Sequence, residues 1–350
     1  MRPDDRDRRR IRYARDTASR ARAAVRARAR DTLRTDAETP RAGAHGRTRP
    51  TGGIHGDGAV HAAFPARTGD AMTAPVWLLL AGLFGLIIGS FCNVVIHRLP
   101  RIMDAEWEEE LRQAAGPDTT VTATPPRLSL SQPRSHCPHC RTPLRLIDLV
   151  PVLSWLALRG RCHHCQAGIS PRYPLVELAS AGLAVLSVWQ LGPGAEALAC
   201  YGLLVTLLTA ALVDQASQWL PDRITLPLLW TGLLVTSLGL NPAGTDLGDA
   251  VWGAAAGYLS LWLVAGGFRL VTGRDGLGGG DSKLLAALGA WLGWMPLPSV
   301  LLLSSLTGLV IALWLRWRHG HRGSFAFGPA IALAGALLFW QQVGNPTLPY

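Results

Sequence analysis

The chain has 350 residues, of which 49% are hydrophobic and 17% are charged, and its formal net charge is +10. Most of this charge belongs to one end: residues 1–71 carry 17 Arg against nine acidic residues, whereas residues 72–350 carry 17 basic and 15 acidic residues. The body of the chain therefore lacks the basic excess of a nucleic-acid-binding protein, and we expect no nucleic-acid partner.

The segment 1–71 is poor in apolar residues and has no apolar stripe at helical spacing, so we expect a disordered, Arg-rich extension. It lacks the apolar central region of a secretory signal. The composition favours a non-functional extension over an Arg-rich targeting or acid-binding arm. A start of translation at Met72, directly before the first apolar run, is a further alternative. Proline and glycine interrupt the segment at Pro40, Pro50, Gly52, Gly53, Gly56 and Gly58.

From Met72 onward the chain is dominated by long apolar runs, the first of which is 71–96 without a charged side chain. Crossing about 30 Å of hydrocarbon takes about 20 apolar residues at about 1.5 Å each. The run 284–315 is broken at Met-Pro-Leu-Pro (295–298), which predicts two helices joined by a tight turn. The pattern predicts an all-α polytopic membrane protein with about eight transmembrane helices. The other candidate spans are 178–194, 197–213, 224–240, 250–268 and 326–343.

The basic residues indicate how these spans are oriented. If the first span runs from outside to inside, the segments 97–175, 214–223, 269–283 and 316–325 lie inside, and all 17 basic residues after Met72 fall in them. Cytoplasmic loops collect Arg and Lys, so these segments are expected in the cytoplasm. The Arg-rich extension would oppose this orientation, which strengthens the case for a start at Met72. The predicted divisions are the extension 1–71, a first transmembrane helix 72–97, a cytoplasmic loop 98–173 and a seven-helix membrane domain 174–345.

The cytoplasmic loop contains two C-x2-C motifs, Cys137-Pro-His-Cys140 and Cys162-His-His-Cys165, separated by 21 residues. Four thiolates at such a spacing can close a tetrahedral zinc site, from which a short loop without its own core gains its fold. The alternatives are two disulfides or unpaired thiols, and the reducing cytoplasm disfavours disulfides. We therefore predict Cys137, Cys140, Cys162 and Cys165 as zinc ligands. Neighbouring histidines could substitute as ligands, but four cysteines already fill the site; they are His136, His139, His163 and His164.

Two further features have less specific interpretations. Cys92 and Cys200 lie in apolar spans and are predicted to be small core residues rather than ligands. Residues 106–112, Glu-Trp-Glu-Glu-Glu-Leu-Arg, are expected to form a short helix after the first span. Its acidic run is most simply a solvated face, and the alternative is a docking surface for a basic substrate segment.

Three carboxylates lie at the predicted cytoplasmic edge of the membrane: Glu177, Asp214 and Asp281. An ionisable side chain in a span is costly and is therefore a candidate for function. Two carboxylates that share a water molecule can split an amide, one accepting a proton from the water while the other polarises the carbonyl. Asp281 follows a glycine-rich stretch, 276–280, which allows close approach of a peptide backbone. The simpler alternative is that Asp281 and Asp222 cap helices.

Several of these segments resemble the bacterial type IV prepilin peptidase family, also called prepilin leader peptidase/N-methyltransferases. The resemblance runs through nearly all of residues 78–340. Its motifs are the first-helix signature Gly89-Ser-Phe-Cys-Asn-Val-Val-Ile-His-Arg-Leu-Pro100 (with Cys92 where Leu is usual), the paired cysteine motifs, Arg172-Tyr-Pro-Leu-Val-Glu177, Leu220-Pro-Asp-Arg-Ile-Thr-Leu-Pro-Leu-Leu-Trp230, and Gly278-Gly-Gly-Asp281, which has the G-x-G-D form of this class of membrane aspartyl protease.

The resemblance implies that Asp214 and Asp281 are catalytic and that Asp222 is structural or faces the substrate. One departure is Ala216, where many members carry a second acidic residue. The family removes a short basic leader from type IV prepilins and type II secretion pseudopilins at the cytoplasmic face of the bacterial inner membrane. Many members then methylate the new N-terminus with S-adenosylmethionine. In this family the cysteine loop is associated with the methylation activity. Gly160 and Arg161, directly before Cys162, therefore mark the candidate methyl-transfer region. The residues that bind the methyl donor cannot be read from the sequence.

Two other classes of protein are alternatives to this interpretation. A transporter would place its membrane carboxylates near the middle of the bilayer and show inverted repeats, whereas here they lie at one face without a convincing repeat. A structural membrane subunit that docks a partner through the zinc loop would leave the glycine–Asp cluster unexplained. A protease without methylation is a narrower alternative, which the sequence separates least well.

Overall fold

The structure is a computed structural model that describes residues 74–115, 128–145, 147–273, 278–319 and 326–344. Contacts divide the chain into two units, Met1–Val60 and His61–Tyr350, and all of the described residues belong to the second. The predicted disorder of 1–71 therefore falls on residues outside the described part of the chain.

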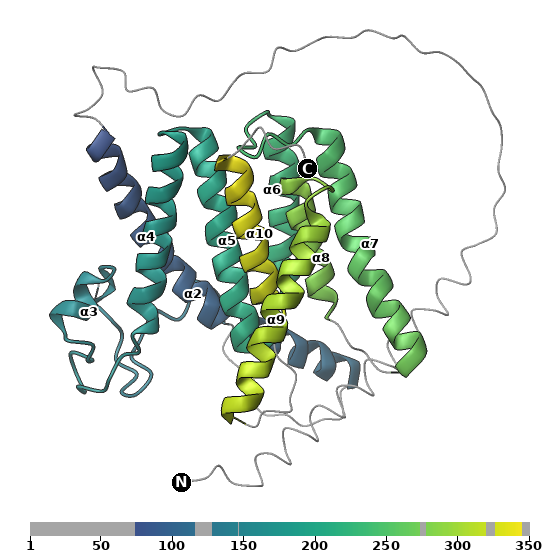
Figure 1. The fold of residues 1–350 in the computed structure, drawn as a ribbon. Helices are drawn as coiled ribbons and strands as arrows, with labels where there is room; N and C mark the ends of the chain where they lie inside the picture. Colours follow the sequence, from purple (N-terminus) through teal and green to yellow (C-terminus); the bar gives the residue numbers. More distant parts are fainter. Residues whose placement is uncertain (1–73, 116–127, 146, 274–277, 320–325, 345–350) are drawn as a thin grey trace, which may run out of the picture. The chain divides into compact units, whose positions relative to one another are not determined.

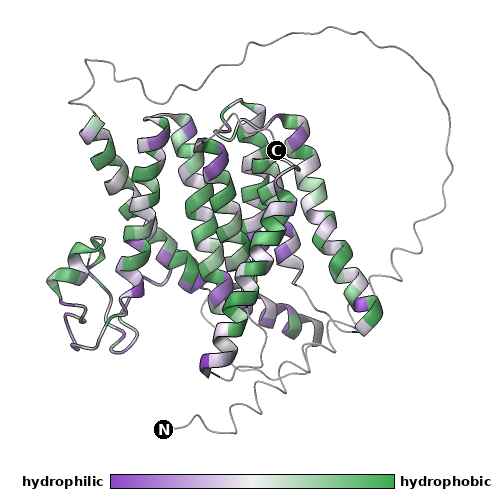
Figure 2. Ribbon diagram, in the orientation of Figure 1, coloured by the Kyte–Doolittle hydropathy of each residue, from purple (hydrophilic) through white to green (hydrophobic). Residues whose placement is uncertain are grey.

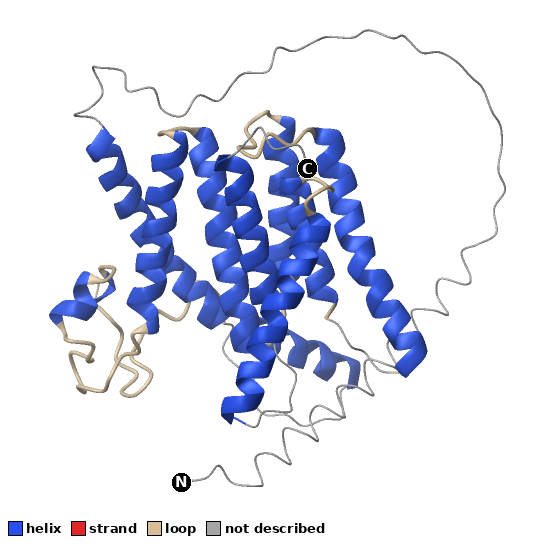
Figure 3. Cartoon of the chain, in the orientation of Figure 1, coloured by secondary structure: helices blue, strands red, loops and turns tan. Residues whose placement is uncertain are grey.

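Within these ranges the regular structure is helical, with two isolated β-bridges and no strand, as Figures 1 and 3 show. The all-α class predicted from the apolar runs is therefore confirmed. The elements are α2 (Ala74–Ala115), a 3₁₀ turn η1 (Ile147–Leu149), α3 (Leu153–Ala157), α4 (Arg172–Leu191), α5 (Ala195–Ser217), α6 (Asp222–Ser237), α7 (Leu247–Thr272), α8 (Gly279–Leu292), α9 (Leu297–His319) and α10 (Gly328–Gly344).

Among the described residues, five helices are long and apolar enough to cross a membrane: α2, α4, α5, α7 and α9. Figure 2 shows that apolar residues dominate these helices. The remaining three predicted spans form α6, α8 and α10, which are shorter at 16, 14 and 17 residues. The break predicted at 295–298 is present, because α8 ends at Leu292 and α9 begins at Leu297.

The first helix is longer than the sequence pattern suggested. α2 continues through Pro100 to Ala115, so residues 106–112 form its last turns rather than a separate helix. A proline inside a helix removes one backbone hydrogen bond and crowds the preceding turn. Leu99 and Ile102, on either side of Pro100, are buried. This apolar packing supports the helix across the proline.

The acidic end of α2 is attached to another helix. Glu106 accepts hydrogen bonds from Arg223 Nη2 at 3.0 and 2.9 Å, and Arg223 lies in the first turn of α6. Glu109 forms a second ion pair with Arg112 on α2 itself, at 3.4 Å. Part of the acidic run is therefore paired within the chain.

The core consists of two apolar clusters that share α5. One cluster lies among α5, α6, α7, α8, α9 and α10 and includes Trp291 and Phe339, whose rings meet edge to face at 6.0 Å. The other lies among α2, α4, α5 and the start of α6 and includes Tyr201 and Val213. α5 contributes buried side chains to both clusters. The end of α5, where Asp214 lies, is consequently fixed from two sides.

Glycine pairs four residues apart allow two helix pairs to pack backbone against backbone. A Cβ on Gly85 or Gly89 of α2 would come within 2.6–2.7 Å of α4 backbone atoms. Gly253 and Gly257 of α7 meet the α8 backbone in the same way, at Gly289 and Leu285. Small residues at this spacing are a common basis of helix packing in membranes. The contact made by Gly253 and Gly257 fixes α8, the helix that carries Asp281.

Candidate functional site

Asp214 lies near the C-terminal end of α5, and its residue is only 5% exposed. The helix ends at Ser217, and the next residue, Gln218, has a left-handed backbone (φ 56°) that turns the chain away. The Asp214 carboxylate accepts a hydrogen bond from the Gly328 backbone N–H at 2.9 Å. Gly328 begins α10, and a Cβ there would lie 2.6 Å from Asp214 Oδ2. Only glycine therefore leaves room for this contact.

Asp281 lies in the first turn of α8 and is 9% exposed. The N-cap position of this helix is Gly278, and Asp281 is the third residue of α8. A Cβ on Gly280 would lie 2.6 Å from the Leu220 side chain, and Leu220 also fills the space beside Gly328. The turn after α5, the start of α8 and the start of α10 therefore meet around Leu220.

This arrangement brings Asp214 and Asp281 together. Their carboxylates lie close enough to act on each other electrostatically. Burying a carboxylate away from water costs on the order of several kcal/mol unless it is paired or hydrogen-bonded. Two carboxylates gathered at helix ends in a hydrophobic bundle are therefore typical of a functional site rather than of a structural one.

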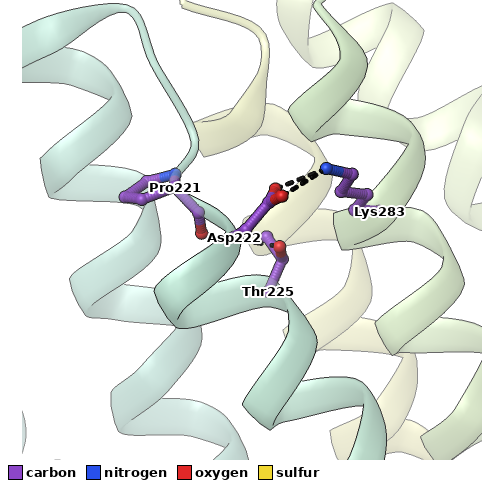
Figure 4. A network of polar contacts seen from close by, with 4 residues as sticks. All are labelled: Pro221, Asp222, Thr225 and Lys283. Atoms are coloured by element: carbon purple, nitrogen blue, oxygen red, sulfur yellow. Dashed lines mark hydrogen bonds and ion pairs between the residues drawn. The ribbon is translucent and has the colours of Figure 1, made fainter. Parts of the chain in front are cut away.

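Beside this pair, Asp222 and Lys283 form an ion pair, shown in Figure 4. The Lys283 ammonium donates to both Asp222 carboxylate oxygens, at 2.5 and 2.6 Å. Asp222 begins α6 directly after Pro221, and Lys283 follows Asp281 by two residues. Thr225 Oγ1 donates to the Pro221 carbonyl at 3.5 Å and helps to hold this turn. Asp222 thus binds across to α8 rather than capping its own helix.

The four predicted zinc ligands form a second site. The Sγ atoms of Cys137, Cys140, Cys162 and Cys165 all lie within 4.8 Å of one another, and those of Cys137 and Cys165 are 3.8 Å apart. Four sulfurs placed at about 2.3 Å from a tetrahedral zinc ion would lie about 3.8 Å apart. All six described cysteines are free thiols, which excludes the two-disulfide alternative for this structure.

The two C-x2-C segments have matching backbones. Cys137 N–H donates to the Thr142 carbonyl at 3.0 Å, and Cys162 N–H donates to the Ala167 carbonyl at 2.9 Å. Hydrogen bonds from Thr142, first from its side chain and then from its backbone, lower the pKa of Cys140 to about 6. Backbone N–H groups of Cys165 and His164 lower the pKa of Cys162. Both effects favour the thiolate, the form that binds metal.

The other sequence candidates have different surroundings. Cys200 and Cys92 are buried in the two apolar clusters, as predicted. Glu177 is 8% exposed, but its carboxylate accepts a hydrogen bond from the Val152 backbone N–H at 2.7 Å. The structure therefore gives Glu177 a partner in the cysteine loop, whereas Asp214 accepts its hydrogen bond from Gly328 of α10.

Sequence reasoning missed three residues of the site: Leu220, Lys283 and Gly328. Gly328 contacts Asp214 across 114 positions, a relation that no local pattern reveals. Lys283 does carry a signal, because it is the single lysine in a chain with 33 arginines. Its place two residues after the G-x-G-D aspartate distinguishes it from an ordinary surface cation.

Comparisons with known proteins agree with the motifs. The chain matches the model of the bacterial peptidase A24 N-terminal domain over residues 83–191 and that of the type IV leader peptidase family over residues 201–313. It is 51% identical to a prepilin leader peptidase/N-methyltransferase of Aeromonas hydrophila over 269 residues, which is 75% of this chain and 91% of the relative.

A relative with the same name in Dickeya chrysanthemi is 50% identical over 75% of this chain and 92% of the relative. Another, in Burkholderia pseudomallei strain 1026b, is 46% identical over 79% of this chain and 89% of the relative. No solved structure shows a significant match.

Proposed function

Since the chain belongs to the type IV leader peptidase family, we propose that it is a membrane aspartyl endopeptidase and N-methyltransferase. It cleaves the basic leader from type IV prepilins and pseudopilins and methylates the new N-terminal residue with S-adenosylmethionine. The names of its relatives support both activities. The observation that carries the proteolytic part is the gathering of two buried carboxylates, Asp214 and Asp281, at the ends of two helices.

In the proposed mechanism Asp214 and Asp281 act as one catalytic pair on a water molecule. The ionised carboxylate takes a proton from the water, and the protonated carboxyl donates to the carbonyl oxygen of the scissile peptide. The water oxygen then attacks the carbonyl carbon, and a proton passes to the leaving amine as the C–N bond breaks. The Gly328 N–H supports this role for Asp214, because it holds one carboxylate oxygen in place.

We further propose that α6, α8 and α10 complete eight membrane crossings. Of the 14 residues in α8, 11 are buried, so most of this helix contacts protein rather than lipid and needs no long lipid-facing surface. The distribution of basic residues supports a cytoplasmic location for the Asp214–Asp281 pair in the bacterial inner membrane. The functional divisions are then the first transmembrane segment 72–97, the cytoplasmic segment 98–173, into which α2 continues as far as Ala115, and the protease domain 174–345.

The four cysteines are proposed to hold a zinc ion with a structural role. A four-thiolate site is closed to further ligands, so zinc would fix the two C-x2-C segments against each other rather than activate a substrate. Gly160 and Arg161, directly before Cys162, form the proposed methyl-transfer region. S-adenosylmethionine would supply the methyl group, and no residue is assigned to its binding.

The test is a paired cleavage and methylation assay on a prepilin, with the enzyme in membranes. Asp281→Asn is expected to abolish cleavage, whereas Cys137→Ser is expected to reduce methylation while cleavage survives. Normal cleavage by Asp281→Asn would return the transporter and structural-subunit hypotheses to contention. Cleavage without methylation in the wild type would leave a protease alone.

A further inference from the structure

Glu177 is a buried carboxylate that the proposed proteolytic mechanism does not use. It lies in the second turn of α4, where Gly89 of α2 packs against it. A Cβ added to Gly89 would lie 2.7 Å from the Glu177 Cα. The Glu177 carboxylate accepts the Val152 N–H at 2.7 Å, and the side chains of Ser90 and Asn93 lie beside it. A membrane helix thus holds, through one carboxylate, the backbone of the loop between the two C-x2-C segments.

The loop backbone at the point of attachment is unusual. Val152 has φ 60° and ψ −49°, and a β-branched residue with positive φ is a genuine outlier that surrounding contacts must maintain. Val152 stands directly before α3, so its N–H bond to Glu177 determines where α3 begins. The carboxylate therefore positions α3 relative to α2 and α4.

From α3 a continuous set of contacts leads to the second C-x2-C segment. Trp155 Nε1 donates to the Ile169 carbonyl at 3.2 Å, and the Gly160 N–H donates to the Trp155 carbonyl at 2.8 Å. Gly160 has φ 68°, and a Cβ there would lie 2.8 Å from the Trp155 ring. Ile169 N–H donates back to the Gly160 carbonyl at 2.7 Å. α3 and the segment around Gly160 are therefore packed as one body.

We infer that Glu177 is a positioning residue that holds the four-cysteine loop against the membrane helices, and that methyl transfer depends on this contact far more than cleavage does. The inference rests on the proposed function for its second half. Asp214 and Asp281 are positioned through Gly328 and Leu220, on elements other than the loop. Loss of the Glu177 contact would leave that pair in place while the Gly160 region loses its fixed position.

The first part of the inference, that Glu177 holds the four-cysteine loop, is tested without an activity assay, by hydrogen exchange of the full chain in detergent micelles. Glu177→Ala is expected to speed amide exchange in residues 150–158 by about tenfold or more, because a hydrogen bond to a charged acceptor is lost. Glu177→Gln keeps an acceptor oxygen and should stay near the wild-type rate. The matched control is Ser180→Ala, one turn further along α4, which removes bonds to Gly85 and Tyr201 but leaves the loop untouched. Unchanged exchange in Glu177→Ala overturns the inference.

The second part of the inference, that methyl transfer depends on this contact more than cleavage does, is tested by measuring cleavage and methylation of a prepilin. Glu177→Ala is expected to methylate about tenfold more slowly while cleavage changes by less than about twofold, and Glu177→Gln should recover most methylation. Equal loss of both reactions, or no loss of either, contradicts the inference. Trp155→Ala interrupts the same contacts within the loop and should reproduce the methylation defect even if Glu177→Ala fails to fold. A wild-type enzyme that does not methylate at all would instead refute the methyltransferase part of the proposed function, and the exchange experiment would still test the Glu177 contact.

Discussion

Lys283 binds Asp222 and thereby ties the helix that carries Asp281 to the turn that follows Asp214. The two side chains are 30% and 54% exposed, and an ion pair so accessible to water contributes little to the free energy of unfolding. In a chain with 33 arginines, the single lysine occupies this position. We therefore expect the pair to matter for the geometry of the site more than for stability.

Removal of either partner, by Asp222→Ala or Lys283→Ala, should slow cleavage by about tenfold, because the start of α8 loses a restraint next to Asp281. The melting temperature should change little. The exchanged pair, Asp222→Lys with Lys283→Asp, should recover part of the lost rate. Cleavage assays on the three variants measure this, and wild-type rates in both single variants would show that the pair does not position the site.

Gly328 is expected to tolerate no side chain. In Gly328→Ala the new Cβ would collide with Asp214 Oδ2 and the Leu220 side chain, so the carboxylate must move. A displacement of about 1 Å at a catalytic group can cost about a hundredfold in rate. Gly202→Ala is the control on α5, since an added Cβ there meets nothing within 4 Å. Similar cleavage rates for Gly328→Ala and Gly202→Ala would show that Gly328 is not part of the site.

Zinc removal should separate the two proposed activities. Cys137→Ser, or treatment with a zinc chelator, should lower bound zinc and methylation and leave cleavage largely intact, because the metal organises only the loop. Cys200→Ala is the control, since Cys200 lies in an apolar cluster away from the four ligands. Zinc content by atomic absorption gives the direct measurement. Full zinc retention in Cys137→Ser would show that the four thiols are not the binding site.

The α7–α8 contact should be sensitive to volume. Gly253→Val would place methyl groups against the Gly289 backbone, and such overpacking costs about 1–3 kcal/mol. We expect a lower melting temperature in detergent together with weaker cleavage, because α8 carries Asp281. Gly266→Val, on the same helix with open space around it, should melt close to the wild type. Equal melting temperatures would indicate that the helices do not pack so closely.

The sequence predicted those features that depend on local composition. Apolar runs indicated the helices, and the C-x2-C spacing indicated the cysteine cluster, since both patterns are carried by neighbouring residues. The length of α2 was underestimated because its continuation through Pro100 depends on packing of Leu99 and Ile102 in the folded chain. The span predicted at 224–240 is shifted in the structure, where α6 covers Asp222–Ser237.

The parts of the site that escaped prediction depend on tertiary contacts. The sequence pointed to Asp214 and Asp281 as ionisable residues at span ends, but not to the groups that surround them. The Gly328 N–H has no distinctive local pattern, and the motif that begins at Leu220 does not reveal that this side chain packs beside Gly280 and Gly328. Glu177 was grouped with the two aspartates because all three lie at one predicted membrane face. Its bond to Val152 depends on where the loop returns to the helices.

The most direct test of the catalytic pair is cleavage of a prepilin by purified wild-type enzyme, Asp214→Asn and Asp281→Asn under single-turnover conditions. Each substitution keeps the size of the side chain and removes its capacity to exchange a proton. We predict that neither variant cleaves detectably, although both keep the wild-type zinc content and melting behaviour. Cleavage by either variant within about tenfold of the wild-type rate would contradict the assignment of Asp214 and Asp281 as the residues that activate water.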